Sequence, residues 1–265
     1  MMNYNTIQVY PAAHEGYIYL NRPDKHNAMN REMISEIRDA IGELNRAPSI
    51  RLIVISAKGK SFSSGADLTY MREQGEMTVD ENRADSLDLA GMFYEIYSSP
   101  LPVITVSHGN IAGGAIGIIA ACDYALTSQD SIFKFSEVQL GLVPATIAPY
   151  VMDRIGRSRS AELMLTARSF FGIEAERYGL VNKSVAREEL AKELQVLLNL
   201  FRKTAPEAVK KTKQLLLEIN DSDRKEKLID ITSAIIAEAR ASDEGKEGLN
   251  AFFEKRKAGW VNENI

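Results

Sequence analysis

Residues 103–127 read VITVSHGNIAGGAIGIIAACDYALT, and this stretch decides the fold class. Its first four residues, Val103–Val106, predict a buried strand. The run Ala115–Cys122 predicts a buried helix, and Tyr124–Thr127 predicts another strand. A glycine pair, Gly113-Gly114, stands directly before the helix. Strand, helix and strand in close succession favour an α/β architecture.

The preceding residues continue this alternation. Ile7–Tyr10 and Tyr17–Leu20 are β-prone runs that predict a hairpin with its turn centred on Glu15-Gly16. Leu52–Ile55 is a second buried strand. Asn30 is a plausible N-cap of a helix, because apolar residues follow it at helical spacing, namely Met33, Ile34, Ile37, Ile41 and Leu44.

The later residues are mostly helical. Residues 84–97 predict a helix, whereas the polar stretch 74–82 predicts a mobile loop. Helical patterns dominate from Ser158 onward, and residues 206–219 and 244–257 are amphipathic. We therefore expect an α/β core over residues 1–200. A helical region over 201–265 should pack on that core and on neighbouring subunits.

Composition narrows the possible functions. The 265 residues are 45% hydrophobic and 26% charged, with a formal net charge of −4, so bulk binding to nucleic acid or membranes is not expected. A single cysteine excludes a disulfide framework. The three histidines are widely spaced, which argues against a metal site. The first residues lack the basic and apolar pattern of a signal peptide, so a cytoplasmic location is expected.

Two small-residue loops follow two of the predicted strands. The first, SFSSGADL at 61–68, comes after Leu52–Ile55, and the second, GNIAGG at 109–114, comes after Val103–Val106. Loops at equivalent strand ends can aim two backbone N–H groups at one oxygen, and each donor contributes on the order of 3 kcal/mol to an anionic transition state. Each loop alone also fits an ordinary turn. A phosphate loop is disfavoured because no GK[ST] follows.

Several ordered motifs extend this pattern along nearly the whole chain. They are LNRPDKHNAM at 20–29, SFSSGADL at 61–68, GNIAGGAIGIIAACD at 109–123, FSEVQLGLVP at 135–144, AERYGLVN at 175–182 and AFFEKR at 251–256. With them the sequence resembles the enoyl-CoA hydratase/isomerase (crotonase) superfamily. That resemblance implies an α/β spiral of ββα units, with C-terminal helices that build homotrimers, often paired into hexamers.

The resemblance also implies a set of site residues. The amides of Ala66 and Gly114 would hold the thioester oxygen of an acyl-CoA substrate, and no cofactor beyond the substrate's own coenzyme A is implied. Phe252 and Lys255 match positions that touch coenzyme A from a neighbouring subunit, although a solvated helix face also fits Lys255. The expected substrate-binding residues are Asn27, Ala28, Ser64, Asp67, Leu68, Thr69, Gly113, Gly117, Thr146, Phe252 and Lys255.

Glu137 matches the family glutamate that exchanges a proton with the carbon next to the thioester, a step that needs a fixed acid or base. Two-glutamate hydratases carry a second glutamate in the helix after the glycine pair, where this chain has Gly117. The loop at 144–150, PATIAPY, also departs from the common PGAGGTQ. A mechanism with two protein carboxylates is therefore not expected.

Both departures resemble bacterial methylglutaconyl-CoA hydratases of leucine breakdown and the related dehydratases of polyketide β-branching. Those substrates carry a carboxylate of their own, which would help position water in place of the missing glutamate. The alternatives are a single-glutamate isomerase, a decarboxylase, a non-catalytic acyl-CoA-binding protein and an RNA-binding protein that uses the basic face at Lys210, Lys211 and Lys213. The sequence does not determine the acyl group or the direction of the reaction. It also leaves open whether coenzyme A or an acyl carrier protein carries the acyl group.

Overall fold

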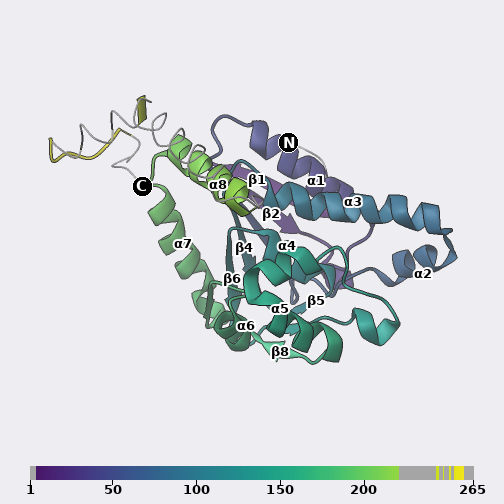
Figure 1. Ribbon diagram of the computed structural model, residues 1–265. Helices are drawn as coiled ribbons and strands as arrows, with labels where there is room; N and C mark the ends of the chain where they lie inside the picture. Colours follow the sequence, from purple (N-terminus) through teal and green to yellow (C-terminus); the bar gives the residue numbers. More distant parts are fainter. Residues whose placement is uncertain (1–3, 221–242, 245–246, 248–250, 252–253, 260–265) are drawn as a thin grey trace. The chain divides into compact units, whose positions relative to one another are not determined.

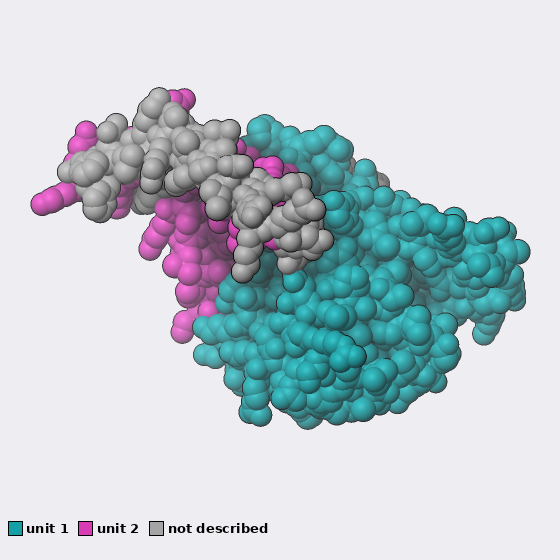
Figure 2. All heavy atoms as spheres, in the orientation of Figure 1, with its two compact units in different colours: residues 1–99, 103–191 teal, residues 100–102, 192–265 magenta. Residues whose placement is uncertain are grey.

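The computed structural model describes residues 4–220, 243–244, 247, 251 and 254–259 (Figure 1). The chain divides into two compact units, shown in separate colours in Figure 2. Unit 1 comprises Met1–Ser99 and Val103–Ala191, and unit 2 comprises Pro100–Pro102 and Lys192–Ile265. The boundary expected near residue 200, and the packing of a helical region on its neighbours, stay predictions.

A six-stranded sheet forms the centre of unit 1. Its order is β1-β2-β3-β4-β6-β9, and all neighbours are parallel except β1 and β2. The side chains of the two central strands β3 and β4 are almost all buried, as expected for parallel strands covered on both faces. The strand bounds are β1 Ile7–Ala12, β2 Glu15–Leu20, β3 Leu52–Ala57, β4 Val103–Ser107, β6 Tyr124–Ser128 and β9 Lys183–Val185.

Unit 1 also contains a small second sheet, whose first two strands follow β4 and β6 in the chain. It has the order β5 (Asn110–Ala112), β7 (Ile132–Lys134) and β8 (Phe170–Phe171). The rings of Phe133 and Phe170 stack within it, with centroids 5.3 Å apart. Strand β5 ends directly before the glycine pair, and its partner β7 ends three residues before Glu137, so their pairing brings the two segments together.

Helices alternate with the strands, which confirms the α/β prediction (Figure 1). In unit 1 they are α1 Arg31–Arg46, α2 Leu68–Glu76, α3 Val79–Tyr97, α4 Gly114–Ala121, α5 Ala148–Thr166 and α6 Gly172–Tyr178, with short 3-10 turns η1 Pro23–Lys25, η2 Glu137–Leu140 and η3 Arg187–Glu189. Asn30 caps α1 as predicted, since its side chain accepts a bond from the Met33 amide. The helices α7 Leu190–Phe201 and α8 Pro206–Asn220 follow.

The predicted position of the first hairpin turn is wrong. Ala12 pairs with Glu15, so the turn consists of Ala13 and His14, and Gly16 lies within β2. A Cβ atom on Gly16 would lie 2.7 Å from Cδ2 of Leu44. This glycine is therefore required for close packing of α1 on the strand and not for a turn.

The predicted loop at 74–82 is also wrong. Helix α2 continues to Glu76, and α3 begins at Val79. Thr78 caps α3 through a reciprocal pair of bonds with Glu81. Both helix ends are solvent-exposed, so their polar sequence reflects exposure and not irregular backbone.

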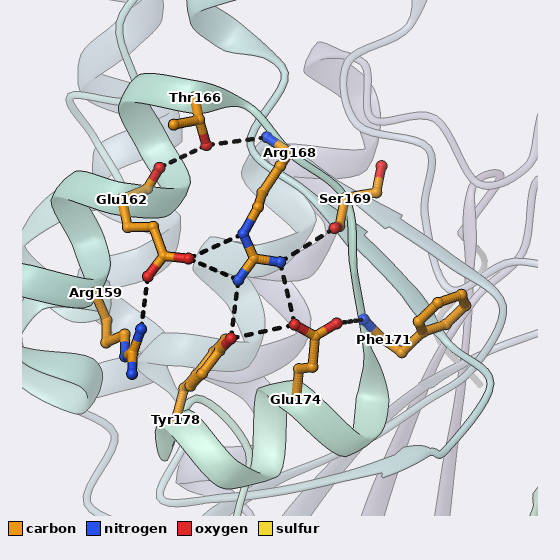
Figure 3. Close-up of polar contacts among 8 residues, drawn as sticks. All are labelled: Arg159, Glu162, Thr166, Arg168, Ser169, Phe171, Glu174 and Tyr178. Atoms are coloured by element: carbon orange, nitrogen blue, oxygen red, sulfur yellow. Dashed lines mark hydrogen bonds and ion pairs between the residues drawn. The ribbon is translucent and has the colours of Figure 1, made fainter.

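A charged cluster joins the end of α5 to α6 through β8 (Figure 3). The guanidinium of Arg168 donates two bonds to Glu162 and one each to Glu174 and Tyr178. The end of α5 is thereby tied to α6, and the Phe171 amide of β8 donates a further bond to Glu174. In the described part of the chain, no helix has the length and apolarity that crossing a membrane requires.

Candidate active site

The two small-residue loops lie side by side. The Phe62 amide donates to His108 O (2.8 Å), the Ser63 amide to Asn110 O (3.2 Å), and the Ala112 amide back to Ser63 O (3.1 Å). The loop after β3 is thus paired with the loop after β4 as a short parallel ladder. The sequence expectation that these loops meet is confirmed.

Met29 attaches to the first loop through its backbone. Its amide donates to Gly65 O, and its carbonyl accepts from the Asp67 amide, both at 2.8 Å. In this parallel pairing, the residue between the two bonded positions points its own N–H to the opposite side. That residue is Ala66, which is exposed and whose amide donates no hydrogen bond within the described chain.

The second unpaired amide belongs to Gly114. Gly113 adopts φ 53° and ψ −126°, a conformation open in practice only to glycine. Its amide donates a hydrogen bond to Lys134 O (3.1 Å). Gly114 then starts α4, and among the described residues its amide has no acceptor. The partial positive charge of a helix N-terminus adds to this donor.

Met29 also reaches the second loop. Its terminal Cε lies 2.7 Å from the place where a Cβ atom of Gly114 would stand. One residue therefore pairs with the Ala66 loop by its backbone and packs on Gly114 by its side chain. The two unpaired amides thus belong to loops that share a contact through Met29, and two such donors are what a site for a developing oxyanion uses.

Glu137 lies beside the glycine pair. It begins η2, two residues after the fully buried Phe135, and its Oε1 lies 3.3 Å from the place of a Gly113 Cβ. Its Oε2 is buried and has no hydrogen-bond partner in the described chain. Burial raises the pKa of the Glu137 carboxyl above its usual 4.5. A carboxyl group with a raised pKa beside two amide donors is suited to proton transfer at a carbon next to a carbonyl.

The space in front of Gly117 is filled. A Cβ atom there would lie 2.3 Å from Cγ2 of Ile147 and 2.8 Å from Cε1 of Phe93. Both side chains are almost completely buried. The position of the absent second glutamate is thus an apolar wall. Thr146, half-buried, is the neighbour of Ile147.

Asn27 is used entirely within the protein. Its Oδ1 accepts from the Arg22 amide (2.7 Å), and its Nδ2 donates to Lys58 O (2.8 Å) and Ser61 O (2.9 Å). The neighbouring Ala28 is buried, and its carbonyl accepts a bond from the Arg22 guanidinium. The Asn27 side chain therefore positions the first loop, and any ligand contact falls to other groups of this segment.

Asp67 starts α2 as its N-cap. Its Oδ1 accepts from the Thr69 amide (2.9 Å), and its Oδ2 pairs with Arg22 (2.9 Å). Burial alone would raise the pKa of Asp67, but these partners lower it, so the residue stays ionised. Ser64, Leu68 and Thr69 around it are exposed, Leu68 by 81%.

A cavity of about 580 Å³ extends from Asp67 and Thr69 toward the start of α1. The basic residues Arg22, Lys25 and Arg31 line it together with polar and acidic side chains. None of these three residues was among the expected substrate-binding residues, although Arg22 and Lys25 lie within the motif at 20–29.

Of the two C-terminal candidates, the structure describes only Lys255. Lys255 is exposed and has φ 54°, within unit 2. Phe252 lies outside the described residues. Over the described ranges, no group of three or more histidine, cysteine or acidic side chains is arranged to hold a metal ion.

Comparison with known proteins gives a consistent result. The family model described as enoyl-CoA hydratase/isomerase matches residues 14–263. Crotonyl-CoA hydratase from Syntrophomonas wolfei is 32% identical over 92% of this chain and 93% of its own length. A solved enoyl-CoA hydratase from Shewanella pealeana is 35% identical, with a TM-score of 0.93 over 97% of this chain and 96% of that one. A solved Legionella pneumophila chain is 38% identical, with a TM-score of 0.90 over 96% and 98%.

Proposed function

Because this chain belongs to the enoyl-CoA hydratase/isomerase family, we propose that it hydrates 3-methylglutaconyl-CoA to 3-hydroxy-3-methylglutaryl-CoA, or catalyses the reverse dehydration. It is an enzyme of the crotonase superfamily and has the α/β fold of solved enoyl-CoA hydratases. The choice of a dicarboxylic substrate is the part that we propose. With this substrate the enzyme would act in leucine breakdown or in a chemically similar pathway.

Groups of this chain account for one of the two parts of water addition, which is protonation of the carbon next to the thioester. The amides of Ala66 and Gly114 bind the thioester oxygen as negative charge develops on it, each contributing on the order of 3 kcal/mol. Protonated Glu137 delivers its proton to the carbon next to the thioester. The raised pKa of Glu137 maintains a larger protonated fraction than an ordinary glutamate would have.

The single observation that carries the substrate class is the filled space at Gly117. Ile147 and Phe93 occupy the place where a second carboxylate would activate water. Addition of water still requires a group that accepts its proton. A carboxylate on the substrate itself supplies such a group, and 3-methylglutaconyl-CoA carries one.

Steady-state assays on a panel of thioesters test this proposal. We expect turnover of 3-methylglutaconyl-CoA and little hydration of crotonyl-CoA, which has no second carboxylate. In water enriched in heavy oxygen, the product should gain one solvent oxygen. Equal kcat/KM for both thioesters would contradict the proposed role of the substrate carboxylate.

Double-bond isomerisation is the second candidate. One carboxylate can move a proton between two carbons without water, and the apolar packing at Gly117 suits such a reaction. An isomerase product gains no oxygen from the solvent, so the same labelling experiment separates the two activities. In either case Glu137→Gln should abolish turnover and retain thioester affinity, which would exclude a purely binding function.

A further inference from the structure

One face of α4 is bare of side chains and is covered by three apolar residues. Gly114 and Gly117 are three positions apart, so they lie on the same helix face. Met29 covers Gly114, Ile147 covers Gly117, and Phe93 touches both, at 3.7 Å and 2.8 Å from the two Cβ positions. The cover is therefore continuous from the oxyanion amide to the place of the absent glutamate.

This cover is tightly packed. Phe93 is fully buried and Ile147 is 1% exposed. The ring of Phe93 also lies 6.2 Å from that of Tyr150, which stands one helical turn after Ile147. Contacts of 2.3 Å and 2.8 Å are too short for any real Cβ atom, so even a methyl group at 117 requires Ile147 to move.

From this packing we infer that Ile147 is a specificity-determining residue. Its Cγ2 methyl group occupies the space that a side chain at 117 would take. It thereby keeps this wall of the site apolar and excludes a second protein carboxylate. Glycine at 117 and isoleucine at 147 act as one unit, which restricts hydration to substrates that bring their own proton acceptor. The inference rests on the proposed function for its catalytic consequence, but the packing can be tested independently.

A double-mutant cycle tests the packing without any substrate. We expect Gly117→Ala to lower the melting temperature, because the new methyl group collides with Ile147. Ile147→Ala should lower it by leaving a cavity. The double variant should melt clearly higher than the sum of the two losses predicts, since each change relieves the other. Leu163→Ala, which removes a fully buried side chain near the other end of α5, should combine additively with Gly117→Ala.

A gain of activity tests the specificity. In Gly117→Glu combined with Ile147→Ala, hydration of crotonyl-CoA should exceed that of Ile147→Ala by about a hundredfold, the lower range for one positioned acid or base. Gly117→Glu alone should show no such gain, because the carboxylate has no space. The solvent-oxygen label in the product identifies hydration.

Two results would overturn the inference. The first is an additive thermal cycle, equal to the Leu163 control. The second is a folded Gly117→Glu, Ile147→Ala enzyme with no gain on crotonyl-CoA. If the Gly117→Glu, Ile147→Ala variant does not fold, the thermal cycle with Gly117→Ala and Ile147→Ala still tests the inference. Absence of activity of the wild-type enzyme on 3-methylglutaconyl-CoA would instead contradict the proposed function and leave the thermal cycle valid.

Discussion

Glu137 is the residue whose ionisation separates the two candidate reactions. Hydration begins with a protonated Glu137, because the group gives its proton to carbon. We therefore expect kcat/KM for 3-methylglutaconyl-CoA to fall as pH rises through the pKa of Glu137, which burial places above 4.5. A pH profile from steady-state rates measures this directly. Isomerisation requires the ionised group first, so a profile that rises through the same pKa would support the isomerase.

The same residue affects stability. Burial raises the pKa of the Glu137 carboxyl in the folded state. Its contribution to stability is therefore complete only when the pH is below the pKa that the same carboxyl has in the unfolded chain, about 4. That contribution is lost as pH rises through the raised value, because the ionised form has no partner for Oε2. Glu137→Gln removes the ionisation. Its melting temperature should exceed that of the wild type at about pH 8 and approach it near about pH 4. A constant difference at both pH values would contradict this account.

Individual residues differ in how far the sequence predicts them. Gly113, Gly114 and Ala66 stand in small-residue loops after strands, and the structure places their backbones together. Met29 and Ile147 are apolar residues far along the chain from the glycines that they cover. Apolar side chains carry no sign of which partner they contact, so the sequence alone does not predict their roles.

Among the elements, α5, β8 and α6 depend on Arg168 (Figure 3). We expect Arg168→Ala to destabilise unit 1 by about 1–2 kcal/mol, because two carboxylates and Tyr178 lose their shared donor. Differential scanning calorimetry should show a melting point lower by roughly 2–4 °C for each kcal/mol. Arg159→Ala, which removes one exposed ion pair to the same Glu162 and a cation–π contact with Tyr178, serves as the matched control. An equal loss in both variants would assign the effect to general surface charge.

Periodicity predicts the long elements well and their ends less well. The apolar spacing after Asn30 fixes α1, because one buried helix face imposes a 3.6-residue repeat. The first turns of α3 are exposed, so no such repeat marks them. Gly16 is a different case. It resembles a turn residue in the sequence, but only the packing of Leu44 explains it.

For the whole molecule, self-association remains a prediction. A trimer or hexamer should show a mass of three or six times 29.4 kDa by light scattering. If Lys255 contacts coenzyme A in that assembly, Lys255→Ala should raise KM by about two- to fivefold with kcat unchanged, as expected for one exposed charge contact. A pantetheine thioester lacks the nucleotide phosphates and should show no such change. A monomer with full activity would contradict the expected assembly.

The two proposed oxyanion donors are main-chain groups, and this has a consequence for how such an enzyme diverges in evolution. A substitution at Ala66 retains the amide unless it introduces proline, so the donor is inherited with the path of the backbone and not with the identity of the residue. Gly113 has no comparable freedom, because its combination of φ 53° with ψ −126° is open in practice only to glycine. If the proposed roles hold, descendants can thus change acyl preference at positions such as 147 and still keep the enolate chemistry of their ancestor.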